Sequence, residues 1–264
     1  MTKPIQIKNL LIGSGLPKVC VPLTSQTREE LGREAAAAKA AGADLVEWRA
    51  DFYENLTDAQ MTLEVLKELS DILGQIPLLF TIRTKEEGGS CQISTRDYVN
   101  LNIAAAQSQK ADFVDVEVFG EEEEKKALIT EIQSAGAKVI ASSHDFEKTD
   151  DQETLLKRFQ DMDATGADIL KIAVMPNEFE DVAAIMQATS RMSREFTEKP
   201  LISMAMGSLG SISRIAGENF GSSVTFAAVG AASAPGQFPI RELRMMMDAL
   251  HEKNRTEDSP RMND

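Results

Sequence analysis

One lysine of the chain lies in an apolar segment, where a charged side chain is unusual. Lys171 stands in the run Ile169–Met175, and all its neighbours in that run are apolar. A buried lysine is rare and costly unless it is paired or uncharged. An uncharged lysine amine is a nucleophile that condenses with a ketone to form an imine. The alternative is a structural lysine that reaches solvent from a strand end or joins a buried salt bridge, and the segment alone leaves both open.

The chain has only two histidines, His144 and His251, as candidates for a proton-transfer group that works near neutral pH. His144 ends the apolar segment Lys138–His144. A single histidine in such a place is more often structural, but the next apolar segment along the chain carries Lys171. An amine and an imidazole on neighbouring strands form a nucleophile and its proton-transfer partner. His251 closes an amphipathic C-terminal stretch and is interpreted as structural.

Three arginines follow apolar segments in this strongly acidic chain. Arg49, Arg83 and Arg214 could each form a salt bridge at the surface, and for any one of them that is the better interpretation. Three of them near one opening, in a chain of net charge -14, indicate an anionic ligand. Arginine binds carboxylates through two parallel hydrogen bonds, so a small carboxylic acid is the favoured ligand.

Short apolar segments alternate with amphipathic stretches along the chain, which is typical of parallel strands buried on both faces. The predicted strands are Val19–Leu23, Asp44–Arg49, Leu78–Arg83, Phe113–Val118, Lys138–His144, Ile169–Met175, Leu201–Met206 and Val224–Val229. The clearest predicted helices are Thr27–Ala41, Thr57–Leu73 and Glu121–Ala135. Eight strand–helix units predict an α/β fold, a (β/α)8 TIM barrel. An open doubly wound sheet is the alternative, but the sequence has no G-x-G-x-x-G after its first strand and no P-loop.

In such a barrel the reactive side chains lie at the C-terminal ends of the strands and in the loops that follow. Residues two apart on a strand point to the same side, as Glu47 and Arg49 do, and as Met204 and Met206 do. The other polar residues at these ends are Arg83, Glu87, Asp115, Glu117, His144, Asp145, Lys171, Arg214, Ser233 and Gln237.

We expect one barrel domain over residues 1–264. Residues 1–16 contain a predicted β-hairpin of Ile5–Ile7 and Leu10–Ile12, which would cover the bottom of the barrel, and residues 252–264 form a polar tail. The acidic charge argues against nucleic acid and anionic membrane partners. Two cysteines suit reduced thiols in the cytoplasm, and no signal peptide or membrane-spanning run is recognised.

Several short motifs in a fixed order resemble the type I 3-dehydroquinate dehydratase family, from about Leu10 to His251. They are Glu47-Trp48-Arg49, Phe80-Thr81-Ile82-Arg83, Glu86-Glu87-Gly88-Gly89, Ser142-Ser143-His144-Asp145-Phe146, Lys171-Ile172-Ala173-Val174-Met175-Pro176, Ser211-Ile212-Ser213-Arg214 and Ser233-Ala234-Pro235-Gly236-Gln237. Each motif is weak by itself, but their shared order is highly specific.

The resemblance implies a cytoplasmic homodimer of the shikimate pathway, in which a TIM barrel dehydrates 3-dehydroquinate to 3-dehydroshikimate. It implies an imine on Lys171, His144 as general acid/base, Glu87 as the carboxylate that orients His144, and Arg214 as the group that binds the substrate carboxylate. The remaining substrate contacts that it implies are Glu47, Arg49 and Arg83 to ring hydroxyls, Met204, Met206 and Phe226 as an apolar wall, and Ser233 and Gln237 in a closing loop. No step of this chemistry requires a metal or another cofactor, and no His/Cys cluster has metal-ligand spacing.

Two other functions are compatible with the sequence. A class I aldolase also uses an imine lysine in such a barrel, and a phosphate substrate would require a glycine-rich loop after the seventh or eighth strand. Gly207–Gly210 is a weak candidate, whereas the arginines suit a carboxylate better. A non-catalytic barrel that binds a small acid or a protein is the second alternative, and the presence of both Lys171 and His144 argues against it.

Overall fold

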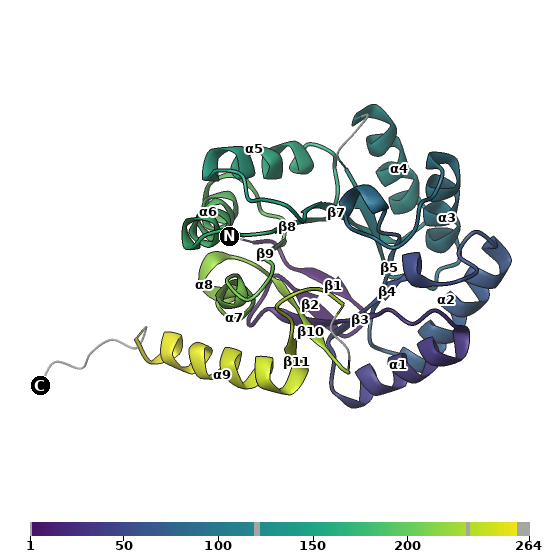
Figure 1. The fold of residues 1–264 in the computed structure, drawn as a ribbon, viewed down its shortest axis with the longest axis horizontal. Coiled ribbons are helices and arrows are strands. Elements are labelled where there is room, and N and C mark those ends of the chain that lie inside the picture. The colour runs from purple at the N-terminus through teal and green to yellow at the C-terminus, as the bar shows by residue number, and fades with distance from the viewer. Residues whose placement is uncertain (1, 119–121, 231–232, 258–264) are drawn as a thin grey trace, which may run out of the picture.

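The computed structural model describes residues 2–118, 122–230 and 233–257, and its central feature is a ring of parallel strands (Figure 1). The strands are β3 (Lys18–Leu23), β4 (Leu45–Arg49), β5 (Leu78–Thr81), β6 (Phe113–Glu117), β7 (Lys138–Asp145), β8 (Ile169–Val174), β9 (Leu201–Ala205) and β10 (Val224–Ala228). They neighbour one another in the order β10-β3-β4-β5-β6-β7-β8-β9. The backbone N–H of Ser223 donates to Leu201 O at 2.7 Å, beside a parallel bridge between Leu201 and Ser222, and this joins β9 to β10. The predicted (β/α)8 barrel is confirmed.

Helices form the outer layer of the ring (Figure 1). They are α1 (Arg28–Ala40), α2 (Ala59–Leu73), α3 (Thr95–Gln107), α4 (Glu122–Ser134), α5 (Gln152–Asp163), α6 (Phe179–Arg191), α7 (Ser211–Ile215), α8 (Gly217–Phe220) and α9 (Ile240–Glu257), with short turns η1 (Ala50–Phe52), η2 (Lys85–Glu87) and η3 (Met192–Phe196). Side-chain caps start four of them: Thr27, Asp58, Ser94 and Asp151 each accept a hydrogen bond from a backbone N–H of the first turn. The predicted helix start at Glu121 lies outside the described residues.

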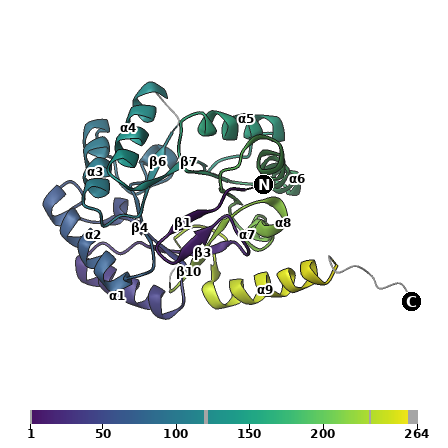
Figure 2. The same cartoon turned by 180° about the vertical axis from the view of Figure 1, so that it is seen from behind.

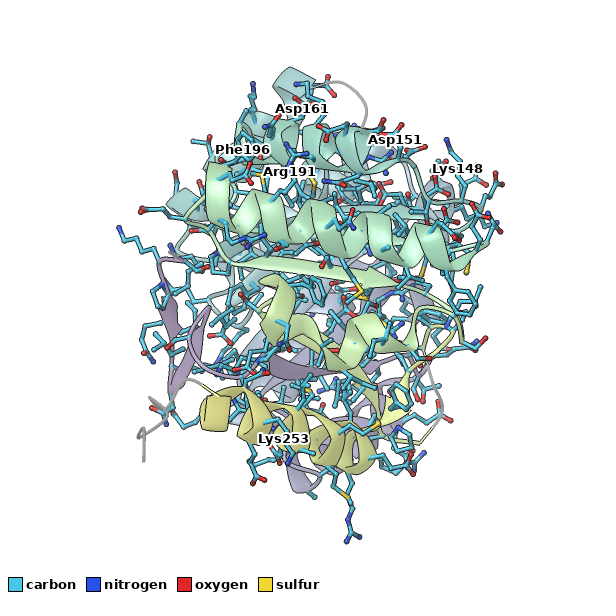
Figure 3. All side chains as sticks on the ribbon, turned by 90° about the vertical axis from the view of Figure 1, so that its left-hand side faces the viewer. Lys148, Asp151, Asp161, Arg191, Phe196 and Lys253 are labelled. Atoms are coloured by element: carbon cyan, nitrogen blue, oxygen red, sulfur yellow. The ribbon has the colours of Figure 1, made fainter. Side chains whose placement is uncertain are left out.

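The two ends of the barrel can be recognised from α5 and α6, which lie side by side on its outside (Figure 3). Lys148, in the loop after β7, lies at one end of this layer, and Phe196, which precedes β9, lies at the other. An ion pair between Arg191 of α6 and Glu153 of α5 joins the helices. The end marked by Lys148 is the C-terminal end of the strands, where the predicted site belongs.

The strand period of two divides side chains between two apolar clusters. On β4, Trp48 points outward into the layer between strands and helices and packs edge-on against Phe80 at 5.5 Å between ring centroids. Its neighbours Glu47 and Arg49 point to the other side, into the mouth of the barrel. A second cluster, which includes Leu45, fills the barrel interior.

The N-terminal hairpin, β1 (Ile5–Ile7) and β2 (Leu10–Ile12), lies across the end of the barrel opposite the site (Figure 2). Ile12 is fully buried within the interior cluster, and Ile5, Ile7 and Leu10 pack against it. The prediction that this hairpin covers the bottom of the barrel is confirmed.

The C-terminal helix α9 continues to Glu257, into the predicted polar tail 252–264. The helix is held there by contacts to α8. His251 Nδ1 lies 2.7 Å from Glu218 Oε1, and Asn254 Nδ2 donates to Asn219 Oδ1. The last seven positions of the expected tail, 258–264, lie outside the described residues.

Two further features complete the description of the fold. The sequence pattern missed β11 (Phe238–Pro239), because two residues are too short to show an alternation of apolar and polar positions. Among the described residues, no helix is long and apolar enough to cross a membrane.

Ile12→Ala should destabilise the protein by about 2–5 kcal/mol, because it opens a cavity where the hairpin closes the barrel. Leu11→Ala is the matched control, since Leu11 is the neighbouring residue on the other face and is 39% exposed. We expect its effect on the free energy of unfolding to be much smaller, roughly 0.5 kcal/mol. Urea unfolding of both variants measures the difference. Equal losses would contradict the role assigned to Ile12.

Candidate active site

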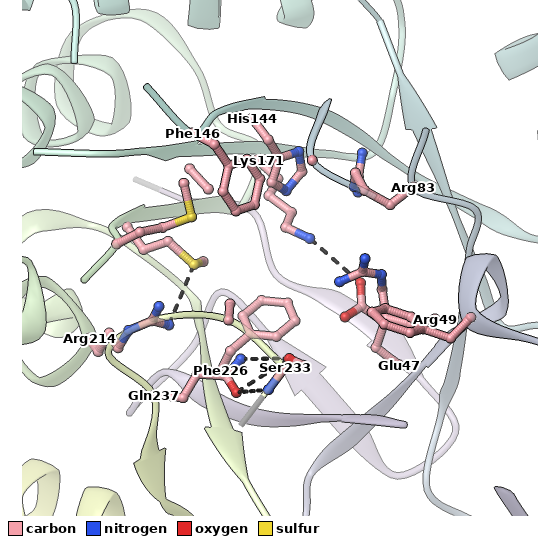
Figure 4. Close-up of a pocket in the computed structure, with 16 residues that line it drawn as sticks. Glu47, Arg49, Arg83, His144, Phe146, Lys171, Arg214, Phe226, Ser233 and Gln237 are labelled. Atoms are coloured by element: carbon pink, nitrogen blue, oxygen red, sulfur yellow. Dashed lines mark hydrogen bonds and ion pairs between the residues drawn. The ribbon is translucent and has the colours of Figure 1, made fainter. Parts of the chain in front are cut away.

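An open cavity lies at the C-terminal end of the strands (Figure 4). Its lining includes the predicted Glu47, Arg49, Arg83, His144, Lys171, Met204, Met206, Arg214, Phe226, Ser233 and Gln237. Glu87 is the one predicted site residue outside the lining, because it lies behind His144. Phe52, Gly88, Phe146, Ala173 and Ala234 complete the lining, and none of them was predicted as a site residue.

Lys171 extends from β8 into the cavity and is almost completely buried (Figure 4). Its Nζ lies 3.6 Å from Glu47 Oε1 and 3.7 Å from Asp115 Oδ2. The same nitrogen lies 4.7 Å from the centre of the Phe226 ring, within the range of a cation–π interaction. The amine therefore has buried carboxylate neighbours and also faces the cavity, so the geometry is compatible with both interpretations of the sequence.

His144 comes from the adjacent strand β7, whose register pairs it with Ala173 of β8. Its Nδ1 lies 2.9 Å from Glu87 Oε2, and its backbone N–H donates to the same oxygen at 3.0 Å. Glu87 therefore fixes both the ring and the backbone of His144. With Nδ1 engaged, Nε2 is the nitrogen that can exchange a proton with a ligand in the cavity.

Burial shifts the pKa values of both members of this pair. Burial, followed by the cations of Arg83, Lys171 and Arg49, lowers the pKa of His144 well below its ordinary value. Burial raises the pKa of Glu87 to about 8, with the Glu117 carboxylate adding to the rise and Arg83 opposing it. His144 is therefore uncharged near neutral pH, the form that can accept a proton.

Arg83 is buried, and its guanidinium binds several carboxylates. Its Nη2 donates to Asp115 Oδ1 at 2.7 Å, and its Nη1 donates to Glu117 Oε1 at 2.8 Å and to Ser142 Oγ at 3.0 Å. A longer contact of 3.3 Å reaches Glu87 Oε2. Burial opposes the charge on Arg83, yet the surrounding carboxylates raise its pKa well above the ordinary value.

Arg49 is also paired, with a residue that the sequence analysis missed. It donates twice to Asp51, at 2.8 Å in each contact, and lies over the Phe52 ring. Asp51 also accepts from the backbone N–H groups of Arg83 and Ser90. It therefore joins the loops after β4 and β5, but it lies in η1 beyond the strand end and outside the period of two.

Arg214 differs from the other two arginines because it has no carboxylate partner among the described residues. It is buried, its Nη2 donates to Pro235 O at 3.0 Å, and its Nη1 lies 3.7 Å from Met204 Sδ. Its Nε is buried and has no hydrogen-bond partner among the described residues. Burial lowers its pKa to about 10, so the side chain stays charged at neutral pH. A buried cation that faces a cavity without a carboxylate partner can accommodate an anion.

The loop that follows β10 lies against Arg214. Ser233 N–H donates to Gln237 Oε1 and Gln237 Nε2 donates to Ser233 Oγ, each at 2.9 Å. A Cβ on Gly236 would lie 2.2 Å from Gly207 O, so only glycine allows this approach. Ser233 and Gln237 thus shape the loop whose Pro235 carbonyl contacts Arg214. Residues 231–232 of the same loop lie outside the described residues.

Comparison with known proteins identifies the family of this chain. The model of the type I 3-dehydroquinase family matches residues 19–254. This chain belongs to that family. It is 42% identical over 251 residues to the 3-dehydroquinate dehydratase of Bacillus licheniformis, covering 95% of this chain and 99% of that protein. It is 43% identical over 250 residues to the enzyme of Klebsiella pneumoniae, covering 95% and 100% of the two chains.

A solved structure gives the same assignment. The type I 3-dehydroquinate dehydratase of Clostridium difficile, crystallised with covalent modified comenic acid, is 40% identical and superposes with a TM-score of 0.93. The alignment covers 96% of this chain and 100% of that one. This family member is accordingly a hydro-lyase.

The partners of Arg83 could be identified only from the tertiary structure. Asp115, Glu117 and Ser142 surround Arg83. The strand period of two turns Asp115 and Glu117 to one side of β6, but this period does not show which cation they meet.

In the described part of the chain, no group of three or more His, Cys, Asp or Glu side chains is placed to hold a metal ion.

The lowered pKa of His144 predicts a pH dependence of stability. Below the ordinary value of 6.5, the unfolded chain binds a proton at His144 that the folded chain does not. The free energy of unfolding therefore falls as pH decreases through 6.5. His144→Gln lacks this loss, so the stability of wild type relative to the variant should decrease between about pH 7.5 and about pH 5.5. A difference that stays constant in denaturant melts across that range would contradict the assignment.

Proposed function

We propose that this enzyme dehydrates 3-dehydroquinate to 3-dehydroshikimate in the shikimate pathway, through a Schiff base on Lys171 with His144 as general acid/base. The observation that carries the proposal is one cavity in which a buried amine and an uncharged imidazole on adjacent strands face an unpaired buried arginine. The names of the curated relatives supply the substrate.

The chemistry follows from these groups. The Lys171 amine adds to the ketone, water leaves, and the protonated imine becomes an electron sink. His144 removes the C2 proton, and the electron pair moves towards the imine nitrogen to give an enamine. The enamine then expels the C1 hydroxyl, which takes the proton from His144 and departs as water. Addition of water to the product imine releases 3-dehydroshikimate and restores Lys171.

The charges of the cavity support one orientation of the substrate. Arg214 would bind the carboxylate, and it lies across the cavity from Arg49 and Arg83 (Figure 4). Glu47, Arg49 and Arg83 would face the ring hydroxyls. Because Arg49 and Arg83 already bind carboxylates of the protein, they have fewer free donors than the resemblance implies.

The remaining lining completes the proposed substrate site. Met204, Met206 and Phe226 would form its apolar wall, and Ser233 and Gln237 would close over the ring. The relative from Clostridium difficile was solved with covalent modified comenic acid, which supports a site that bonds covalently to its ligand. A homodimer in the cytoplasm stays a prediction from the family resemblance.

Borohydride with 3-dehydroquinate should inactivate the enzyme and leave a stable ligand adduct on Lys171, because borohydride reduces an imine to a secondary amine. Lys171→Met is the matched control, since it keeps the length and apolar stem of the side chain and removes the amine. Peptide mapping by mass spectrometry locates the adduct. An adduct on another lysine would contradict the assignment of Lys171, and no adduct at all would contradict the imine.

His144→Ala should lose turnover by roughly 10²–10⁴-fold, the usual contribution of general acid–base catalysis, and should still form a reducible adduct. Intact-mass measurement identifies the adduct, because substrate and product imines differ by one water. His251→Ala is the control: it removes the other histidine, which pairs with Glu218 and is not part of the cavity lining. If His144→Ala turned over at the wild-type rate, another group would be the base, with Glu87 the first candidate.

A further inference from the structure

Asp115 is a fully buried carboxylate of β6 whose two oxygens have different surroundings. Oδ1 accepts hydrogen bonds from Arg83 Nη2 at 2.7 Å and from Ser142 Oγ at 2.6 Å. Oδ2 is buried with no hydrogen-bond partner among the described residues, and it faces Lys171 Nζ at 3.7 Å. A buried oxygen without a hydrogen bond is costly, so its direction towards the amine requires an explanation.

We propose that Asp115 is a positioning residue that acts as the fixed counter-ion of the Lys171 nitrogen and stabilises the protonated imine. The inference rests on the proposed function, because it concerns the nitrogen on which that imine forms. Asp115 is absent from the cavity lining, so it approaches Lys171 from within the barrel and does not compete for substrate.

Asp115 is suited to this role because it remains ionised inside the protein. Burial alone raises the pKa of its carboxyl group, but the charges of Arg83 and Lys171 and the hydrogen bond from Ser142 overcome that effect and hold the pKa below its ordinary value. The negative charge is therefore in place before the imine forms. A preorganised charge of this kind stabilises a buried cation without having to reorient.

Glu47 also lies close to the amine, but its position indicates a different role. Its Oε1 accepts from Thr81 Oγ1 at 2.9 Å and lies 3.6 Å from Lys171 Nζ. Glu47 lines the cavity, so a bound ligand meets it directly. Of the two carboxylates beside Lys171, only Asp115 is shielded from the ligand and tied to a second cation.

The small side chain of Ser142 makes the contact possible. Asp115 and Lys171 lie on strands that are separated by β7, and Ser142 is the β7 residue paired with Lys171. Its hydroxyl donates to Asp115 and accepts from Arg83. A larger residue at position 142 would fill the space through which Asp115 reaches the lysine.

Asp115→Asn tests the proposal. Asparagine keeps the size of the side chain and an oxygen for Arg83 and Ser142, and it turns an uncharged amide towards Lys171. We expect borohydride trapping of 3-dehydroquinate in a single turnover to slow by roughly 10²-fold, the usual effect of losing one preorganised electrostatic contact. The alcohol that corresponds to 3-dehydroquinate with its ketone reduced cannot form an imine, so its binding affinity should be unchanged.

Glu117→Gln is the matched control. Glu117 binds the same guanidinium at 2.8 Å and is also buried, but it forms no ion pair with Lys171 among the described residues. Its substitution disturbs Arg83 without changing the charge that faces Lys171, so it should slow trapping much less than Asp115→Asn does. If Glu117→Gln slows trapping as much as Asp115→Asn does, the effect passes through Arg83 and the proposal is wrong.

Separate measurements test whether the variant is folded and whether the wild-type enzyme forms the imine. Thermal melting and binding of the alcohol establish whether Asp115→Asn is folded. If Asp115→Asn does not fold, Asp115→Ser, which also removes the charge, is tested in its place. A folded variant that traps substrate at the wild-type rate would overturn the role of Asp115 alone. Absence of an adduct in the wild-type enzyme would overturn the imine on Lys171, and this inference with it.

Discussion

The organisation of the site depends on one buried cation, the guanidinium of Arg83. It binds Asp115 and Glu117 of β6, Ser142 of β7 and, at a longer distance, Glu87 of η2. Without this cation, the buried carboxylates of Asp115 and Glu117 would lie together with Glu87 and no positive partner, where like charges repel strongly. The rest of the site can be built at the mouth of the barrel because Arg83 balances these charges.

Each side of this network leads to one of the two groups with a proposed catalytic role. On one side Glu87 holds His144, and burial keeps the imidazole uncharged and able to accept a proton. On the other side Asp115 faces Lys171, whose nitrogen would carry a positive charge in the proposed imine. In the proposed mechanism, the network keeps a neutral base and a cationic electrophile in one cavity, and Asp115 faces only the second of them. This separation of roles is what an elimination through an imine requires.

The proposed anion site at Arg214 is built on the opposite principle. Arg214 has backbone and sulfur contacts and no carboxylate neighbour among the described residues, so its charge remains available for a ligand. The loop after β10 covers it through the Pro235 carbonyl and is shaped by Ser233 and Gln237. The bottom of the barrel, by contrast, is sealed by the apolar hairpin. The apolar bottom and the charged mouth both follow from how the strands divide their side chains.

The sequence by itself determined the barrel, the hairpin and the strand ends from which the site is built, because buried strands and amphipathic helices have distinct periods. The same period of two placed Glu47 beside Arg49 on one side of β4. Only the tertiary structure decided which charges meet. Arg83 contacts Asp115 across a distance of 32 positions in the sequence, and Asp51 reaches Arg49 from a turn that has no strand period. Such pairings depend on which strands become neighbours and on the size of residues such as Ser142 between them, and neither is encoded in a local pattern.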